Sequence, residues 1–159
     1  MTEVRCGIGL DVHAFVENRP LIVGGIRIDH PLGLAGHSDA DVLIHAVIDA
    51  LLGAAGLGDI GLHFPDTDEK YRGISSVILL ERTRDMIIQA GWRIGNIDAT
   101  IIAQKPKFAP YMEEITRRLA STLTVERERV NIKATTTEKL GFTGRGEGVA
   151  ALATASLWR

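Results

Sequence analysis

The sequence predicts a protein of the α+β class, built of α/β-type layers: a mixed four-stranded main sheet with helices packed on one face. Two observations support this fold class. Runs typical of strands alternate with runs typical of helices along the 159 residues, which favours helices layered on a sheet. One helical run, before Gly56, is apolar on nearly every side, as expected for a helix buried in the core. At this length we expect a single domain, residues 1–159.

Two extended segments are expected first. Residues 4–10 are predicted to form a strand, and residues 21–28 form a second extended run. The pair Gly24-Gly25 interrupts that run, which indicates a bulge or a hairpin turn. Alternation along the first strand places Cys6 on the face opposite Asp11. We therefore interpret Cys6 as a small, buried hydrophobic side chain.

The next expected element is the apolar helix that ends near Gly56. Ser38 is its predicted N-cap, with Asp41 three residues on in the capping-box position. The polar exceptions in this helix, Asp41, His45 and Asp49, are spaced by four and lie on one stripe. Unpaired polar groups are costly in a buried helix, so the stripe needs partners. A metal would satisfy His45, and Asp49 could orient that ligand.

The rest of the chain is predicted to contain a loop, two helices and three strands. The loop is rich in Gly, Asp and Pro, the first helix ends at a C-capping Gly91, and the second has Pro110 near its first turn. The last run is rich in Ala; strand and helix are both possible there, and we favour a strand. In chain order the segments are 56–72 (loop), 76–90 (helix), 96–104 (strand), 110–122 (helix), 130–137 (strand) and 148–158 (strand).

Composition excludes several classes of partner. The net charge is −2, from 18 basic and 20 acidic residues, so there is no electrostatic case for binding nucleic acid or a membrane surface. No apolar run approaches the ~20 residues of a membrane span. The single cysteine excludes an intramolecular disulfide and fits a reducing compartment. We expect a cytoplasmic protein.

Asp11, His13 and His45 form a candidate zinc site. Asp11 and His13 are two residues apart after a strand-like run, so their side chains point to one face. Two imidazoles and one carboxylate are a ligand set typical of catalytic zinc, which leaves its fourth position open. A thiolate-rich structural site is excluded by the lone cysteine. The alternative is a chance pair on the strand and a core histidine on the helix, but the polar stripe favours the metal.

Three polar segments are candidates for binding phosphate or sugar groups. Residues 59–68 are dense in carboxylates, although an ordinary solvated loop explains them as well. Lys105 and Lys107 follow the end of a predicted strand, where ligand loops are common. In residues 134–148, consecutive threonines, glycine amides and an arginine suit phosphate oxygens, yet the run is neither a Walker A sequence nor a dinucleotide fingerprint. Glu138 there is either a Mg²⁺ ligand or a surface carboxylate.

Taken together, these motifs closely resemble the 2-C-methyl-D-erythritol 2,4-cyclodiphosphate synthase family. The resemblance is carried, in order, by Gly7–Phe15, His37–Asp41 with His45, Asp59–Asp68, and Ala134–Gly148. It covers essentially the whole chain, whose length is about that of the standalone enzyme. Departures are small: Ala40, Leu62 and Phe108 stand where Gly, a polar residue, and Met or Leu are frequent.

The resemblance implies an enzyme of non-mevalonate isoprenoid biosynthesis, a metal-dependent phosphorus–oxygen lyase. The substrate would be 4-diphosphocytidyl-2-C-methyl-D-erythritol 2-phosphate, whose 2-phosphate attacks the β-phosphorus. CMP leaves and an eight-membered cyclic diphosphate results. By resemblance Asp11, His13 and His45 bind Zn²⁺, and Glu138 helps to hold Mg²⁺ or Mn²⁺ against the diphosphate.

The resemblance also assigns roles to the loops. His37 and Thr136 match the transition-state stabilisers, residues 59–68 the methylerythritol region, and residues 103–109 the cytidine pocket. The family is a homotrimer with active sites between subunits. The implied substrate contacts are Asp11, His13, His37, Ser38, Asp59, Ile60, Gly61, Phe64, Pro65, Asp66, Thr67, Asp68, Ala103, Gln104, Lys105, Pro106, Lys107, Phe108, Ala109, Thr135, Thr136, Thr137, Glu138, Phe142 and Arg145.

Two other functions remain as alternatives. One is a non-catalytic, zinc-dependent binding protein for isoprenoid phosphates, against which Glu138 and Thr136 argue. The other is a metal-dependent phosphoesterase, for which only His37 and His63 are spare candidates as general base. Separately, Phe142 and Arg145 beside flexible glycines suggest a three-fold interface. Three arginines meeting there would need partners, and Glu147 is the available one.

Overall fold

The computed structural model describes residues 2–159, and its elements follow the predicted order. Alternating strands and helices build two layers, with short 3₁₀ turns at residues 69–71, 109–111 and 127–129. The elements are β1 (Val4–Val16), β2 (Leu21–Val23), β3 (Ile26–Ile28), β4 (Gly33–Leu34), α1 (Val42–Ala55), α2 (Ile60–His63), α3 (Ser76–Gln89), β5 (Arg93–Ile102), α4 (Met112–Leu123), β6 (Val130–Thr135), α5 (Gly141–Gly144) and β7 (Gly148–Trp158).

The main sheet is mixed, as predicted, but it has five strands rather than four. Its order is β4-β1-β7-β5-β6, antiparallel except for the parallel pair of β5 and β6. The extra strand β4 is only two residues long, too short to leave an alternating pattern in the sequence. It pairs with Phe15 and Val16 because β1 continues well past Leu10, where the predicted strand ended.

The other predicted segments are largely confirmed, with shifted boundaries. Gly24 and Gly25 take positive φ values of 64° and 72° and turn β2 into β3, so the second extended run is a hairpin. The final segment is a strand, as favoured. The loop at residues 56–72 contains the short helix α2 and a 3₁₀ turn. Both are shorter than the length at which helical periodicity becomes visible.

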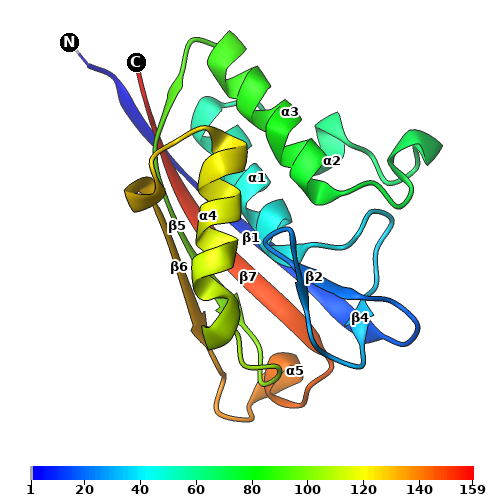
Figure 1. Ribbon diagram of the computed structural model, residues 1–159. Coiled ribbons are helices and arrows are strands. Elements are labelled where there is room, and N and C mark those ends of the chain that lie inside the picture. The colour runs from blue at the N-terminus through cyan, green and yellow to red at the C-terminus, as the bar shows by residue number, and fades with distance from the viewer. Residues whose placement is uncertain (1) are drawn as a thin grey trace.

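The helices α1, α3 and α4 cover one face of the sheet, which confirms the predicted layering (Figure 1). The opposite face carries exposed apolar side chains of β1, of which Val4, Ile8 and Leu10 are each more than 60% exposed. Cys6 lies on this face too and is exposed, so the prediction of a buried thiol is wrong. Its placement opposite Asp11 was right, but residues 2–159 form no second layer over that face, where Val4, Ile8 and Leu10 are also exposed.

The helix α1 approaches β1 unusually closely. A Cβ on Gly9 would lie 1.9 Å from the carbonyl oxygen of Ala46, and one on Gly7 would lie 2.1 Å from that of Ala50. Glycine on the strand therefore allows direct contact between the two backbones. This contact brings the helical residue His45 beside the strand residues that follow Gly9.

The N-cap of α1 is Asp41, not Ser38 as predicted. The Asp41 carboxylate accepts hydrogen bonds from the backbone N–H groups of Ile44 (3.0 Å), Gly24 (2.9 Å) and Gly25 (2.6 Å). One buried side chain thus caps the helix and fixes the β2–β3 turn against it. Both Ser and Asp are good caps, and the turn amides decide between them. The helix ends at Gly56, with φ of 73°, as predicted.

No helix in residues 2–159 is long and apolar enough to cross a membrane.

Candidate active site

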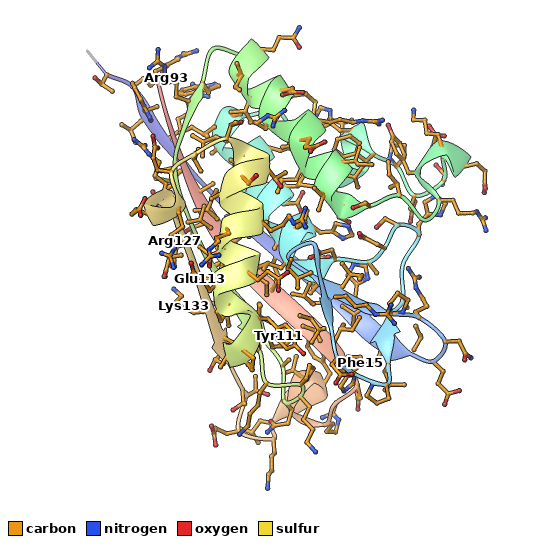
Figure 2. The ribbon with its side chains drawn as sticks, in the orientation of Figure 1. Phe15, Arg93, Tyr111, Glu113, Arg127 and Lys133 are labelled. Atoms are coloured by element: carbon orange, nitrogen blue, oxygen red, sulfur yellow. The ribbon has the colours of Figure 1, made fainter. Side chains whose placement is uncertain are left out.

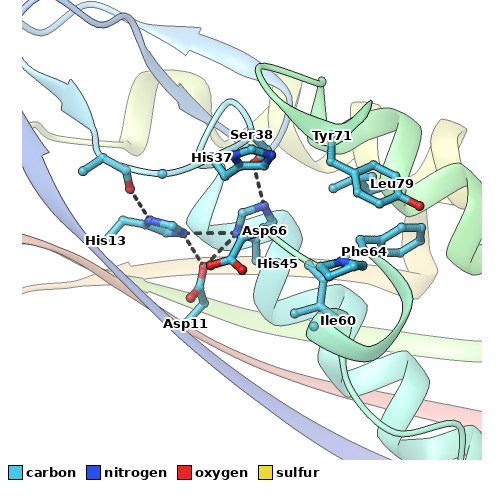
Figure 3. Close-up of a pocket in the computed structure, with 14 residues that line it drawn as sticks. Asp11, His13, His37, Ser38, His45, Ile60, Phe64, Asp66, Tyr71 and Leu79 are labelled. Atoms are coloured by element: carbon cyan, nitrogen blue, oxygen red, sulfur yellow. Dashed lines mark hydrogen bonds and ion pairs between the residues drawn. The ribbon is translucent and has the colours of Figure 1, made fainter. Parts of the chain in front are cut away.

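Asp11, His13 and His45 converge as the sequence predicted (Figure 3). Asp11 Oδ2 lies 2.9 Å from His13 Nε2 and 3.0 Å from His45 Nδ1, and the two nitrogens are 3.2 Å apart. Ligands at about 2.05 Å from a tetrahedral zinc would be about 3.3 Å apart. The three donor atoms therefore fit one small divalent ion with little adjustment.

Hydrogen bonds on the far side of each ring orient the two histidines. His13 Nδ1 donates to the carbonyl oxygen of Ala35, and His45 Nε2 lies 2.9 Å from Ser76 Oγ. With these bonds in place, His13 Nε2 and His45 Nδ1 face Asp11, donating to it while they carry a proton and able to offer a lone pair to a metal once that proton leaves. A ligating histidine commonly has its other nitrogen bonded in this way.

Asp11 and His13 each shift the other's pKa. Burial works against the ionised carboxylate, but hydrogen bonds from His13 and His45 outweigh it and hold the pKa of Asp11 well below its usual range. Burial likewise opposes the charged form of His13, yet the bond to Asp11 raises its pKa. Asp11 is thus an ionised ligand at neutral pH, and a metal competes with a proton at His13.

A cavity of about 430 Å³ opens beside these three residues. Its walls come from β1, α1, the segment before α1, and the loop around α2 (Figure 3). Tyr71 and Leu79, which the sequence analysis missed, add apolar surface. The predicted site residues that line it are Asp11, His13, His37, Ser38, His45, Ile60, Gly61, Phe64, Pro65 and Asp66.

Three predicted contacts in the same loop do not line this cavity: Asp59, Thr67 and Asp68. Asp59 caps α2 by accepting from the backbone N–H of Leu62 at 2.9 Å. The Asp68 carboxylate accepts from the backbone N–H of Lys70, and its carbonyl oxygen accepts from His37 Nε2 at 3.1 Å. Asp59 and Asp68 therefore hold the shape of the loop, and Asp68 also orients His37.

A second cavity of about 710 Å³ lies at the carboxyl ends of β5 and β6. It is lined by all of residues 103–109, with Thr135 and Thr136. Beyond it, Thr136 Oγ1 donates to Glu138 at 3.0 Å, and Thr137 Oγ1 donates to the carbonyl oxygen of Leu140. The candidate site residues thus fall into two groups on one chain. Within residues 2–159, the clustered metal-ligating side chains are Asp11, His13 and His45, and Glu138 stands apart from them.

A third, smaller cavity adjoins the second at the end of β1. Phe15, whose side chain is labelled in Figure 2, lines it together with His30, Lys105 and Arg145. Arg145 donates to Glu147 at 2.6 Å, the partner that the sequence suggested. Phe142 is 38% exposed and does not line it.

The partner of His45 was predicted incorrectly. Asp49 does not orient this ring; its carboxylate instead accepts from the backbone N–H of Ile60 at 2.8 Å and anchors the start of α2. His45 Nε2 instead lies within hydrogen-bond distance of the hydroxyl of Ser76, at the start of α3, and that hydroxyl donates to Asp39. No local pattern marks these two residues, because the contact spans 31 positions.

The chain matches known proteins over nearly its full length. The model of the YgbB family matches residues 4–158. Proteins named 2-C-methyl-D-erythritol 2,4-cyclodiphosphate synthase from Agathobacter rectalis and Thiobacillus denitrificans are 62% and 61% identical to it. These alignments cover 97% and 95% of this chain and 87% and 94% of the relatives.

Solved structures agree with this assignment. The bifunctional IspDF from Campylobacter jejuni superposes with a TM-score of 0.95 at 47% identity, covering 99% of this chain and 42% of that longer protein. The IspF of Plasmodium falciparum, solved as a CDP complex, superposes with a TM-score of 0.84 at 32% identity, covering 97% and 95%. The resemblance read from the motifs is confirmed, and the chain belongs to the YgbB family.

Proposed function

We propose that this protein converts 4-diphosphocytidyl-2-C-methyl-D-erythritol 2-phosphate to 2-C-methyl-D-erythritol 2,4-cyclodiphosphate, with release of CMP, in non-mevalonate isoprenoid biosynthesis. One observation carries the proposal. In a chain about 60% identical to proteins of that name, two imidazoles and a carboxylate converge beside a cavity of about 430 Å³. We expect the enzyme to act in the cytoplasm.

The reaction joins two anionic groups. The 2-phosphate oxygen forms a bond to the β-phosphorus, and the bond from that phosphorus to the oxygen of the departing CMP breaks. Both groups are negative, so their repulsion must be offset by positive charge and by exact positioning. Asp11, His13 and His45 would hold a Zn²⁺ ion. That ion would supply positive charge beside the phosphate oxygens.

The remaining residues of the first cavity would bind and orient the substrate. His37, with its ring held by the carbonyl oxygen of Asp68, would lie beside a phosphate oxygen. Ser38 and the segment from Ile60 to Asp66 would contact the methylerythritol unit. Asp59, Thr67 and Asp68 were expected to be direct contacts. The backbone hydrogen bonds that Asp59 and Asp68 accept support a role for these two residues in shaping the loop.

The second cavity suits the cytidine end of the substrate. Residues 103–109 would enclose the base and ribose. Thr135, Thr136 and Thr137 would contact phosphate oxygens, for which their hydroxyl hydrogens would turn away from the partners they have in the free chain. Glu138 would hold Mg²⁺ or Mn²⁺ against the diphosphate, because such ions commonly combine one or two carboxylates with phosphate oxygens.

We further propose a homotrimer, with each active site formed by two chains. The uncovered sheet face, with Val4, Ile8, Leu10 and Val12 exposed, supports association, since contiguous apolar surface commonly marks an interface. The separation of the zinc cavity from the cytidine cavity within one chain fits a site shared between chains. Sedimentation at micromolar concentration should give three times the monomer mass of 17.2 kDa. A fully active monomer would refute this assembly.

A turnover assay tests the function. Purified protein should release CMP and the cyclic product in equal amounts, without inorganic phosphate. Release of phosphate would instead indicate a phosphoesterase, and binding without turnover would indicate a carrier.

His45→Ala tests the metal site directly. The variant should lose bound zinc and turnover while it stays folded, because Ala is a good helix former. His63→Ala is the matched control. The His63 ring donates to the carbonyl oxygen of Leu57 and lies outside the cavity, so zinc content should stay unchanged. Full zinc content in His45→Ala would remove that residue from the site.

A further inference from the structure

A chain of hydrogen bonds leads from His45 away from the cavity and ends at a carboxylate. His45 Nε2 lies 2.9 Å from Ser76 Oγ. Ser76 Oγ donates to Asp39 Oδ1 at 2.5 Å. The three groups come from three different segments: α1, the first residue of α3, and the irregular segment before α1. The folded chain is therefore what assembles this relay.

The direction of each bond follows from the chemistry of the groups. His45 Nδ1 faces Asp11 and His13, so this nitrogen would offer its lone pair to a metal and the ring proton would stay on Nε2. That N–H donates to Ser76 Oγ, whose single hydrogen is donated to Asp39. Every donor in the series has an acceptor, and the series ends on a negative charge.

Ser38 offers the Nε2 proton a second acceptor, but a weaker one. Its Oγ lies 3.2 Å from His45 Nε2, and it also accepts from the backbone N–H of Ala40. Ser76 is closer and has no exposed surface, so water cannot substitute for its hydroxyl. Asp39 is fixed in turn, because its second oxygen accepts from the backbone N–H of Ser76 at 2.9 Å.

We propose that Asp39, acting through the Ser76 hydroxyl, is a positioning residue for the metal ligand His45. The relay holds the ring in the tautomer and orientation that present Nδ1 to the metal. This inference rests on the metal site of the proposed function. Partners of ligating histidines typically contribute 10- to 100-fold in metal affinity, so the same range is expected for each member of the relay.

Asp39 also has a purely structural role, which the test must separate. Ser75, the N-cap of α3, makes no capping bond with its side chain. The carboxylate of Asp39 serves instead, by accepting from the backbone N–H of Ser76. Ser76→Ala keeps that N–H and removes only the hydroxyl. A change in zinc affinity in Ser76→Ala therefore cannot come from loss of the cap.

Zinc affinity gives a readout that does not depend on turnover. Dissociation constants would be measured by competition with a chromophoric chelator for the wild type, Ser76→Ala, Asp39→Asn and the double variant. Each single variant should bind zinc at least tenfold more weakly. The zinc dissociation constant of the double variant should lie within about twofold of that of the single variant that binds more weakly, because both changes break the same chain of hydrogen bonds. The visible spectrum of bound Co²⁺ should shift in both single variants.

A matched control comes from the same helix. Thr83 of α3 is fully buried, and its hydroxyl donates to the carbonyl oxygen of Leu79. Thr83→Val removes a buried hydroxyl at similar cost to stability and should leave zinc affinity unchanged. If Ser76→Ala does not fold, Ser76→Cys carries the test, because it keeps the backbone N–H that Asp39 caps and replaces the hydroxyl by a thiol, a weak donor and acceptor.

Two results would overturn the inference. One is a Ser76→Ala variant that binds zinc within twofold of the wild type. The other is additive losses in the double variant, which would mean that Asp39 acts through the helix cap and not through Ser76. Failure of the proposed function looks different, because the wild type itself would then take up no zinc.

Discussion

Replacing Gly9 with Ala should break the close backbone contact between β1 and α1. The added Cβ would lie 1.9 Å from the carbonyl oxygen of Ala46 and 2.8 Å from the backbone nitrogen of Ala50. Since Cβ atoms essentially never approach other atoms within 3.0 Å, α1 must retreat from β1 by about 1 Å. Both obstacles are backbone atoms, so no side-chain rotation relieves the clash.

The cost should appear both in stability and in zinc binding. Overpacking of a core typically costs about 1–3 kcal/mol, and a clash between two backbones belongs at the upper end, about 3 kcal/mol. The retreat would also carry His45 away from Asp11, and their present separation of 3.0 Å would grow by a similar distance. Metal sites tolerate only about 0.2 Å of error in each ligand distance. Zinc affinity should therefore fall at least tenfold.

Urea unfolding of the metal-free protein isolates the packing cost, and a chelator competition isolates the zinc effect. Gly53→Ala is the control, because its Cβ would face the same strand at 4.0 Å from the carbonyl oxygen of Ile8. It should stabilise the protein by up to about 1 kcal/mol through helix propensity. The reasoning fails if Gly9→Ala loses less than about 0.5 kcal/mol and binds zinc normally.

Three further outcomes are expected. Glu138→Gln should lower the turnover rate strongly while zinc content is retained, and a raised concentration of Mg²⁺ or Mn²⁺ should restore part of the rate. Unchanged kinetics across a divalent-ion titration would show that Glu138 is only a surface carboxylate. Asp41→Asn should destabilise the protein by about 1–3 kcal/mol in urea unfolding, because its amide turns N–H donors toward the part-buried backbone N–H of Gly25. Zinc affinity should fall with falling pH, because the hydrogen bond to Asp11 raises the pKa of His13 above its ordinary 6.5 and a bound proton excludes the metal. A chelator competition that gives the same zinc affinity at pH 8 and at pH 6 would contradict this.

The sequence predicted those parts of the site that local geometry determines. Alternation on β1 was enough to place Asp11 and His13 on one face, and the four-residue spacing on α1 marked His45 as a polar group that needs a partner. Both periodicities are properties of single elements. The layered fold and the order of the elements follow from the same kind of information.

What could not be predicted depends on contacts between distant segments. The four-residue spacing on α1 pointed to Asp49 as the partner of His45, and only the docking of α3 on α1 supplies Ser76 instead. The two residues of β4 pair only because β1 is long enough to reach them. The cap of α1 is Asp41 because the turn at Gly24 and Gly25 presents its amides there.

The division of the candidate site between two cavities has a genetic consequence. If a working centre takes its zinc cavity from one chain and its cytidine cavity from the next, then two inactive variants can repair each other. A chain that carries His45→Ala still offers an intact Glu138, and a chain that carries Glu138→Gln still offers intact zinc ligands. Co-expression should therefore restore part of the activity in mixed assemblies. Two alleles that both alter the zinc cavity, such as His13→Ala with His45→Ala, should never complement.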